Sequence, residues 1–87
     1  MNTYRLTVSS ADGNIFCGNA VKLDVRGVEG DLAVMAGHVP FMTSLVPCAC
    51  VIHLEDGTKK TATAQGGLLC VSTDSVTLLS SSFVFDK

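Results

Sequence analysis

The stretch at residues 21–26, Val-Lys-Leu-Asp-Val-Arg, alternates apolar and charged side chains at every position. Because successive side chains of a β-strand point to opposite faces, this pattern predicts a strand with one buried side. The same two-residue period recurs along the chain, at residues 4–8, 48–54, 58–64, 68–72 and 76–80. A last apolar piece at residues 83–85 would extend a sheet edge.

Turn signals separate these segments. Asp12-Gly13 and Asp56-Gly57 favour tight hairpins, because glycine adopts the positive φ that such turns require. Asp74-Ser75 predicts a further turn, and Gly66-Gly67 indicates a bulge or a close approach of two backbones. No segment has a helical period over three turns. The sequence therefore predicts an all-β fold, a flattened β-sandwich or barrel of about eight to ten short strands.

Length and composition limit what the chain can be. Its 87 residues allow one domain, expected to span residues 1–87. Hydrophobic residues make up 47% and charged residues 16%, so part of the apolar surplus is expected to face other proteins. The apolar runs are shorter than the roughly 20 residues of a membrane helix, and the N-terminus lacks a signal-peptide core. These features predict a cytoplasmic protein without a transmembrane segment.

The charge pattern and the reactive side chains predict little chemistry. The net charge is −2 and the six Lys and Arg residues are scattered, so no nucleic-acid partner is expected. No nucleophile–base constellation or phosphate-binding glycine loop is present, so we expect no catalytic residue, no nucleotide site and no cofactor.

The four cysteines, Cys17, Cys48, Cys50 and Cys70, are interpreted as buried free thiols, since nothing indicates a secreted protein. Cys48-x-Cys50-x-x-His53 has a metal-like composition. In an extended strand, however, His53 points away from the two thiols, so no metal site is predicted. His53 is expected to be a solvated strand residue.

Residues 27–47 interrupt the alternation of apolar and polar residues. An acidic turn, Glu29-Gly30-Asp31, precedes a short apolar strand and then Gly37-His38-Val39-Pro40. Pro40 fixes its own φ and holds the preceding residue extended, so a stiff loop is expected here. Stiff loops at the end of a sandwich are good docking surfaces.

The order and spacing of the glycine, proline and other turn residues resemble those of the N-terminal β-sandwich of the epsilon subunit of ATP synthase, called delta in mitochondria. The matching positions lie within residues 3–80 and are Gly30, Gly37, His38, Pro40, Leu45, Pro47, Asp56, Gly57, Gly66, Gly67, Val71 and Val76. By this resemblance the second strand would end near residues 21–25. Cys48 replaces a usual glycine, and Met35-Ala36 replaces the commoner Leu-Pro. The family continues into a two-helix C-terminal domain, and the chain would lack that helical hairpin.

The resemblance implies a non-catalytic rotor subunit of an F-type ATP synthase. Such a subunit binds the gamma subunit and the c ring, and it couples proton-driven rotation to ATP synthesis. The resemblance also implies that Glu29, Asp31 and His38, at the sandwich end facing the ring, would contact its polar loops. The alternative for His38 is a loop residue bonded to nearby backbone. The implied location is peripheral, on the cytoplasmic face of a bacterial inner membrane or the equivalent side of another energy-coupling membrane.

Two other kinds of protein remain as alternatives. One is a generic β-sandwich adaptor, and the other is a biotinyl or lipoyl carrier domain. Carrier domains present one lysine at a hairpin tip, whereas Lys59-Lys60 follow the Asp56-Gly57 tip. The simpler interpretation of both lysines is a solvated strand face.

Overall fold

The computed structural model describes residues 3–11, 13–37 and 40–86, and these residues form eight strands and no helix. The strands are β1 (Tyr4–Ser10), β2 (Gly13–Ala20), β3 (Lys22–Gly27), β4 (Gly30–Met35), β5 (Phe41–His53), β6 (Lys59–Val71), β7 (Ser75–Leu79) and β8 (Phe83–Phe85). They make one sheet in the order β2-β1-β7-β6-β5-β3-β4, with β8 paired to β6. The all-β prediction is confirmed.

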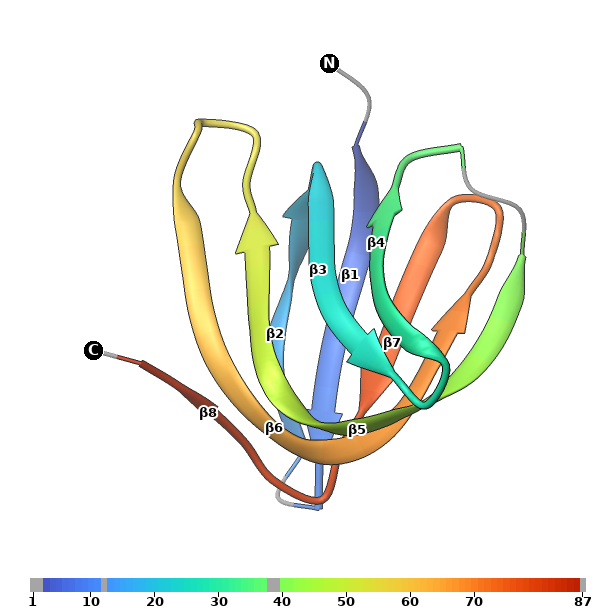
Figure 1. Ribbon diagram of the computed structural model, residues 1–87. Helices are drawn as coiled ribbons and strands as arrows, with labels where there is room; N and C mark the ends of the chain where they lie inside the picture. The colour runs from blue at the N-terminus through green and yellow to red at the C-terminus, as the bar shows by residue number, and fades with distance from the viewer. Residues whose placement is uncertain (1–2, 12, 38–39, 87) are drawn as a thin grey trace.

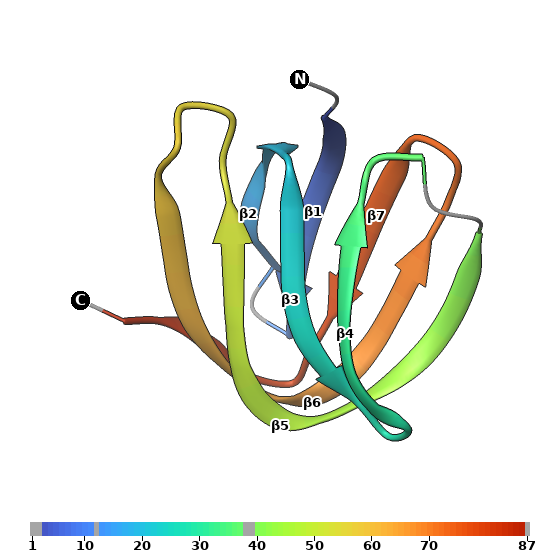
Figure 2. The same ribbon diagram turned by 45° about the horizontal axis from the view of Figure 1, so that its top comes forward.

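Two long strands, β5 and β6, bend so strongly that each takes part in both layers of a sandwich (Figure 1). The layer that we call the β1 layer contains β2, β1, β7, the end of β6 and the beginning of β5. The β3 layer contains β4, β3, the end of β5, the beginning of β6, and β8. Figure 2 shows β3 and β4 in front of β1, β2 and β7, with the bends of β5 and β6 joining the two layers. A parallel pair, β1–β7, lies among otherwise antiparallel neighbours.

The hydrophobic core lies between the two layers. The alternation in the sequence places it correctly, since Tyr4, Leu6 and Val8 of β1 are buried, as are Leu23 and Val25 of β3. The largest fully buried side chains come from both layers, and they are Leu6, Leu23, Ile52, Leu69, Leu78, Val8, Val34 and Cys50.

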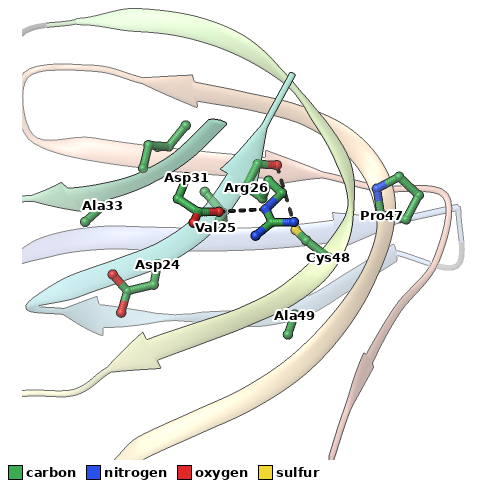
Figure 3. A pocket seen from close by; sticks show the side chains of 9 residues that line it. Asp24, Val25, Arg26, Asp31, Ala33, Pro47, Cys48 and Ala49 are labelled. Atoms are coloured by element: carbon green, nitrogen blue, oxygen red, sulfur yellow. Dashed lines mark hydrogen bonds and ion pairs between the residues drawn. The ribbon is translucent and has the colours of Figure 1, made fainter. Parts of the chain in front are cut away.

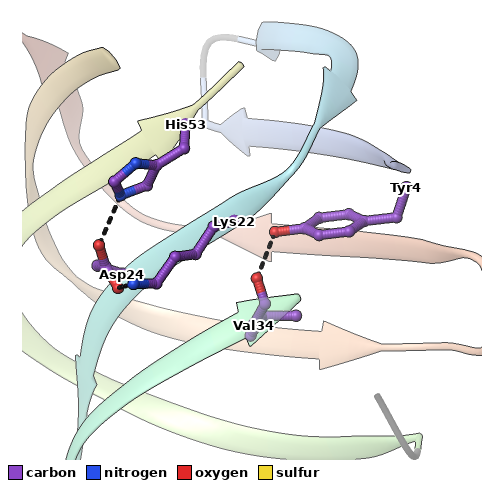
Figure 4. Close-up of polar contacts among 5 residues, drawn as sticks. All are labelled: Tyr4, Lys22, Asp24, Val34 and His53. Atoms are coloured by element: carbon purple, nitrogen blue, oxygen red, sulfur yellow. Dashed lines mark hydrogen bonds and ion pairs between the residues drawn. The ribbon is translucent and has the colours of Figure 1, made fainter. Parts of the chain in front are cut away.

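A buried hydrogen bond also joins the layers: the Tyr4 hydroxyl donates to the carbonyl oxygen of Val34 on β4 at 2.9 Å (Figure 4). Burial, and then the negative charge of Asp24, raise the pKa of Tyr4 well above its ordinary value.

The bend of β6 lies at Gly66-Gly67. The residues that face the core are even-numbered before this point and odd-numbered after it. Both glycines have positive φ, +88° and +142°, and a Cβ on Gly67 would overlap the carbonyl oxygen of Leu79. The predicted close backbone approach is therefore confirmed. The strands predicted at residues 58–64 and 68–72 are one continuous strand with a change of face.

Two other expectations about the strands were wrong. The second strand, expected to end near residues 21–25, is β2 and ends at Ala20, while residues 22–27 form a separate strand. Residues 27–47 also contain more strand than expected, because β5 begins at Phe41 and runs through Pro47. The edge strand β2 has no regular alternation of buried and exposed residues, so the sequence period does not reveal it.

The turns predicted at Asp56-Gly57 and Asp74-Ser75 lie where the sequence places them. In the β5–β6 hairpin, Gly57 has φ +89° and its N–H donates to the carbonyl of Leu54 at 3.1 Å. The Asp56 carboxylate accepts the N–H of Thr58 at 2.8 Å, and bonds with Thr58 lower the pKa of Asp56. The turn predicted at Asp74-Ser75 joins β6 to β7. In the first hairpin Gly13 pairs with Ser10, while Asp12 lies outside the described residues.

Within the described ranges, no helix is long and apolar enough to span a membrane.

Candidate partner-binding surfaces

The acidic segment lies at one edge of the sheet. Gly27 of β3 pairs with Gly30 of β4, so Val28 and Glu29 form the tip of a tight hairpin. Glu29 is exposed in this turn, whereas Asp31 belongs to β4 itself. β4 is the last strand in the sheet order, so its outer side is an open edge in the part of the chain that the structure describes.

Asp31 is held in place by Arg26, which lies directly opposite it on β3. The Arg26 Nε donates to Asp31 Oδ1 at 2.6 Å, and the side chains remain 60% and 75% exposed. The hydrogen bond and positive charge of Arg26 lower the pKa of Asp31. The carboxylate is therefore ionised and oriented at neutral pH, and a partner that binds it must compete with Arg26.

The acidic turn and the Gly-His-x-Pro segment do not lie at the same end of the sandwich. Glu29 precedes β4 and Gly37 follows it, so the two positions are at opposite ends of the strand (Figures 1 and 2). Six strand residues span roughly 20 Å. His38 lies outside the described residues. A contact that includes both segments would have to follow the β4 edge.

A cavity opens beside the Arg26–Asp31 pair, where β5 leaves β3 (Figure 3). The two strands pair at residues 22–24 of β3 and again at Gly27, but five residues of β5, 46–50, lie opposite only two residues of β3. The resulting cavity has a volume of about 620 Å³. Its lining residues are Asp24, Val25, Arg26, Asp31, Leu32, Ala33, Pro47, Cys48 and Ala49.

Pro47 fits within β5 because of this gap. Gln65 is the β6 residue opposite Pro47, and its backbone N–H donates to the carbonyl oxygen of Ser82. This N–H is therefore not hydrogen-bonded to β5. Pro47 and Gln65 are thus a non-hydrogen-bonded pair, and the ring nitrogen of Pro47 faces the side that β3 has left. A proline at this position removes no hydrogen bond between strands, and such positions are the ones in a sheet where proline is tolerated.

All four cysteines are free thiols, but only Cys50 is buried. The expectation of four buried thiols was therefore wrong. Cys17 is exposed and accepts a hydrogen bond from the Arg5 guanidinium at 3.0 Å, while Cys48 and Cys70 are half-buried. Cys17 and Cys70 occupy outward-facing positions of the β1 layer. Because alternate side chains of a strand point to opposite faces, neither thiol points into the core.

His53 also differs from the expectation of a solvated strand residue. Its Nε2 lies 2.7 Å from Asp24 Oδ2, and its side chain is 23% exposed. The other oxygen of Asp24 lies 3.6 Å from the Lys22 ammonium (Figure 4). His53 thus helps to link β5 to β3. Among the described residues, no group of three His, Cys, Asp or Glu side chains is arranged to hold a metal.

The outer face of the β1 layer is almost uncharged, and the sequence analysis did not identify it. Strand register aligns two rows across this face, Cys17-Thr7-Thr77-Cys70-Met42 and Asn14-Ser9-Leu79-Leu68-Ser44. Arg5 is the nearest charged strand residue, and its guanidinium binds Cys17. Met42 is 66% exposed and Leu79 43% exposed. A signal was present in the sequence, because the outward positions of these five strands carry small polar or apolar residues in both rows.

The outer face of the β3 layer is different. It carries the charged side chains of Lys22, Asp24, Arg26, Asp31 and Lys59. The sandwich therefore presents one neutral face and one charged face. A shallow groove of about 400 Å³ on the neutral side is lined by Leu68, Leu79 and neighbouring serines.

The bent two-layer sheet and its contrasting faces define a small β-sandwich domain suited to docking against other proteins. Residues 3–86 match the sequence model of the family described as ATP synthase, Delta/Epsilon chain, beta-sandwich domain, and the chain belongs to this family.

Two solved structures are similar to this chain. A chain of the Euglena gracilis mitochondrial ATP synthase (OSCP/F1/c-ring, rotational state 1) has a TM-score of 0.90 and 26% identity, covering 95% of this chain and 53% of that one. A chain of the Tetrahymena thermophila mitochondrial ATP synthase, from its central stalk and c ring, has a TM-score of 0.75 over 94% of this chain and 66% of that one. Its identity is 10%, which shows the fold alone. The present chain thus spans about half the length of the Euglena chain.

Proposed function

We propose that this chain is a non-catalytic subunit of the central stalk of an F-type ATP synthase, where it binds the gamma subunit and the c ring. In this function it turns with the ring and helps to transmit proton-driven rotation to the catalytic head. The observation that carries the proposal is the family match over residues 3–86. The Euglena chain, which has the same fold over nearly all of this chain, was solved in an assembly with F1 and the c ring.

The proposed function implies a location. The chain would attach peripherally, through its partner subunits, on the side of the membrane that carries the catalytic head. Both similar structures are mitochondrial. Of the two locations that the resemblance implied, the bacterial cytoplasmic face and the equivalent side of another energy-coupling membrane, they support proposing the second.

We assign the gamma contact to the neutral outer face of the β1 layer. Charged residues are depleted at the centres of protein interfaces, whereas Met and aromatic residues are enriched there. This face has Met42, Leu68 and Leu79 among uncharged small residues, while the opposite face has five charged ones. Burying the neutral face therefore leaves few charges without partners.

Matched substitutions test this assignment. Met42→Glu places a charge at a 66% exposed position of the neutral face, and Val84→Glu does the same at a 61% exposed position on the outer side of β8. Co-purification with gamma should be lost for Met42→Glu and retained for Val84→Glu, with both variants folded by circular dichroism. Equal binding by the two variants would exclude the β1 layer as the gamma surface.

We assign the ring contact to the β4 edge, with Glu29, Asp31 and His38 as its polar residues. Glu29 is exposed in the hairpin tip, and Asp31 is exposed and ionised beside Arg26. Exposed charges of this kind set orientation and association rate more than affinity, so the contact should weaken as salt is raised.

The ring contact is tested by comparing Asp31→Asn with Glu55→Gln, a change at an exposed acidic residue of the β5–β6 hairpin. Binding to purified c ring in detergent should weaken for Asp31→Asn at low salt and stay unchanged for Glu55→Gln. If both variants bind like the wild type, Asp31 takes no part in the contact.

A pull-down from the native membrane tests the proposal as a whole. The tagged chain should recover a gamma-type coiled-coil subunit together with the catalytic head. Mass spectrometry of the same sample tests the carrier alternative, because a biotinyl or lipoyl group on Lys59 or Lys60 would favour a carrier domain. Both lysines are exposed at the start of β6, after the hairpin tip.

A further inference from the structure

We propose that Arg26 is a positioning residue for the ring contact, because it holds one oxygen of the Asp31 carboxylate and leaves the other for the partner. This role rests on the proposed ring contact at the β4 edge. It adds a residue that the resemblance did not indicate. The observation that carries it is the way in which the charged side chains pair on the outer face of the β3 layer.

The charged side chains of this face form two separate groups. Both carboxylate oxygens of Asp24 are engaged, since Oδ2 lies 2.7 Å from His53 Nε2 and Oδ1 lies 3.6 Å from the Lys22 ammonium (Figure 4). Asp31 has one engaged oxygen, Oδ1, which accepts a hydrogen bond from Arg26 Nε at 2.6 Å (Figure 3). Among the described residues, no group donates to Asp31 Oδ2. Of these two carboxylates, Asp31 is thus the one with an acceptor left for a partner.

The backbone directs Arg26 toward Asp31. The two residues lie directly opposite each other on β3 and β4, where the Cβ atoms of such neighbours are about 4.5–5.5 Å apart. On its other side Arg26 has no register partner on β5, because β5 leaves β3 there and opens the cavity of about 620 Å³. The cross-strand neighbour of Arg26 on this face is therefore Asp31.

The fold does not depend on this ion pair. The Arg26 and Asp31 side chains are largely exposed, and exposed ion pairs contribute little to stability. The pairing of β3 with β4 is regular over all six residue pairs, without a bulge. A change at Arg26 should therefore alter the Asp31 carboxylate without unfolding the edge.

Arg26 and a partner compete for the same carboxylate, and the competition can end in two ways. If the partner displaces Arg26 from Oδ1, loss of the guanidinium frees the carboxylate and strengthens binding. If the partner binds Oδ2 while Arg26 stays, loss of the guanidinium lets the carboxylate rotate, and binding weakens because the side chain must then be ordered. The second outcome is favoured, since the partner gains a charge-assisted hydrogen bond at the open edge without breaking one.

Arg26 also keeps the Asp31 carboxyl ionised. Its hydrogen bond, and then its positive charge, lower the pKa of Asp31. Without Arg26 this pKa should rise toward its ordinary range, so the carboxylate would become protonated at a higher pH. A role of Arg26 in the fold alone would not move this titration.

The test is a double-mutant cycle on the full chain, with purified c ring in detergent at about 0.1 M salt. Arg26→Gln removes the guanidinium, and Asp31→Asn removes the carboxylate while it keeps the size of the side chain. We expect Arg26→Gln to weaken ring binding about two- to fivefold, the range of an exposed ion pair. In the Asp31→Asn background the same change should have no effect, because Arg26 acts through Asp31.

Lys22→Gln is the matched control. It removes the same charge from the same strand, four residues from Arg26, which is roughly 13 Å along β3. This distance exceeds the Debye length of about 10 Å at 0.1 M salt, so ring binding should stay unchanged. An NMR titration should show the pKa of Asp31 raised by Arg26→Gln and unchanged by Lys22→Gln. Circular dichroism shows whether each variant is folded.

Three results would overturn the role of Arg26. If Asp31→Asn weakens binding but Arg26→Gln does not, the ring contact stands and Arg26 does not position it. If Arg26→Gln weakens binding equally in both backgrounds, Arg26 contacts the ring directly. If Asp31→Asn has no effect, the Asp31 contact and the role of Arg26 both fail, whereas recovery of gamma and the catalytic head in the pull-down would still support a stalk subunit.

Discussion

Gly67→Ala should be the most damaging single methyl addition in this protein. Gly67 combines two constraints that alanine violates. Its φ of +142° lies in the region that side-chain-bearing residues rarely adopt, and an added Cβ would overlap the carbonyl oxygen of Leu79. The overlap involves backbone, because the carbonyl carbon of Leu79 and the Cα of Ser80 are also within 3.0 Å. No flexible side chain can move aside to relieve it.

The magnitude can be built from two contributions. A strained backbone conformation costs about 1–3 kcal/mol, and overpacking costs about another 1–3 kcal/mol. Gly67→Ala should thus lower the free energy of unfolding by roughly 2–6 kcal/mol. At 0.05–0.15 kcal/mol per residue, a domain of this size has on the order of 4–13 kcal/mol in total. The substitution therefore removes a large fraction of the stability.

Gly57→Ala is the matched control. Gly57 also has a positive φ, +89°, but no atom lies within 4 Å of an added Cβ. Only the conformational cost of about 1–3 kcal/mol applies there. Urea unfolding followed by far-ultraviolet circular dichroism gives both free energies. If Gly67→Ala costs no more than Gly57→Ala, the close approach between β6 and the end of β7 does not constrain the bend.

Three further predictions concern buried polar groups. Tyr4→Phe leaves the Val34 carbonyl without its buried donor and should cost about 1–3 kcal/mol in the free energy of unfolding, measured by urea titration. The wild type should also lose stability as the pH rises above about 10, because an unfolded tyrosine ionises there while the raised pKa keeps the folded Tyr4 neutral; Tyr4→Phe should lack this part of the slope. Ser80→Ala should cost about 1–3 kcal/mol, since the buried Ser80 hydroxyl donates to the Gly66 carbonyl at 2.6 Å, and Ser80→Thr distinguishes loss of the bond from change of volume.

The parts of the fold that the sequence predicts are those where one periodicity holds from end to end. β1 and β3 keep a strict two-residue period, so their buried residues follow from the sequence alone. β6 changes its inward face at Gly66-Gly67, and a period count therefore divides one strand into two. The strand expected at residues 48–54 begins at Phe41 instead, and the gap beside β3 lets Pro47 stay within it.

The surfaces were less predictable than the core. Burial follows from local patterns, but the outer face of the β1 layer is formed by five strands, whose order places Thr7 beside Thr77 and Cys70 beside Met42. Such neighbours cannot be found without knowing the register. The acidic turn and the short apolar strand after it were found in the sequence, and that strand is β4. The expectation that the acidic turn and His38 share one end of the sandwich came from the resemblance, and it did not take the length of this strand into account.

The arrangement along β4 leads to a quantitative test of the ring contact. Asp31 is near the beginning of β4, and the positions that bracket His38, Gly37 and Pro40, follow its other end. Residues more than about 7–10 Å apart that share no partner contribute to binding additively, within about 0.3–0.5 kcal/mol. Binding of c ring by Asp31→Asn, His38→Ala and the double variant should therefore show a coupling energy near zero. A ring presents the same loop many times, so one edge can meet two copies at once. A larger coupling energy would mean that both residues bind the same loop, and the contact would then not be spread along the β4 edge.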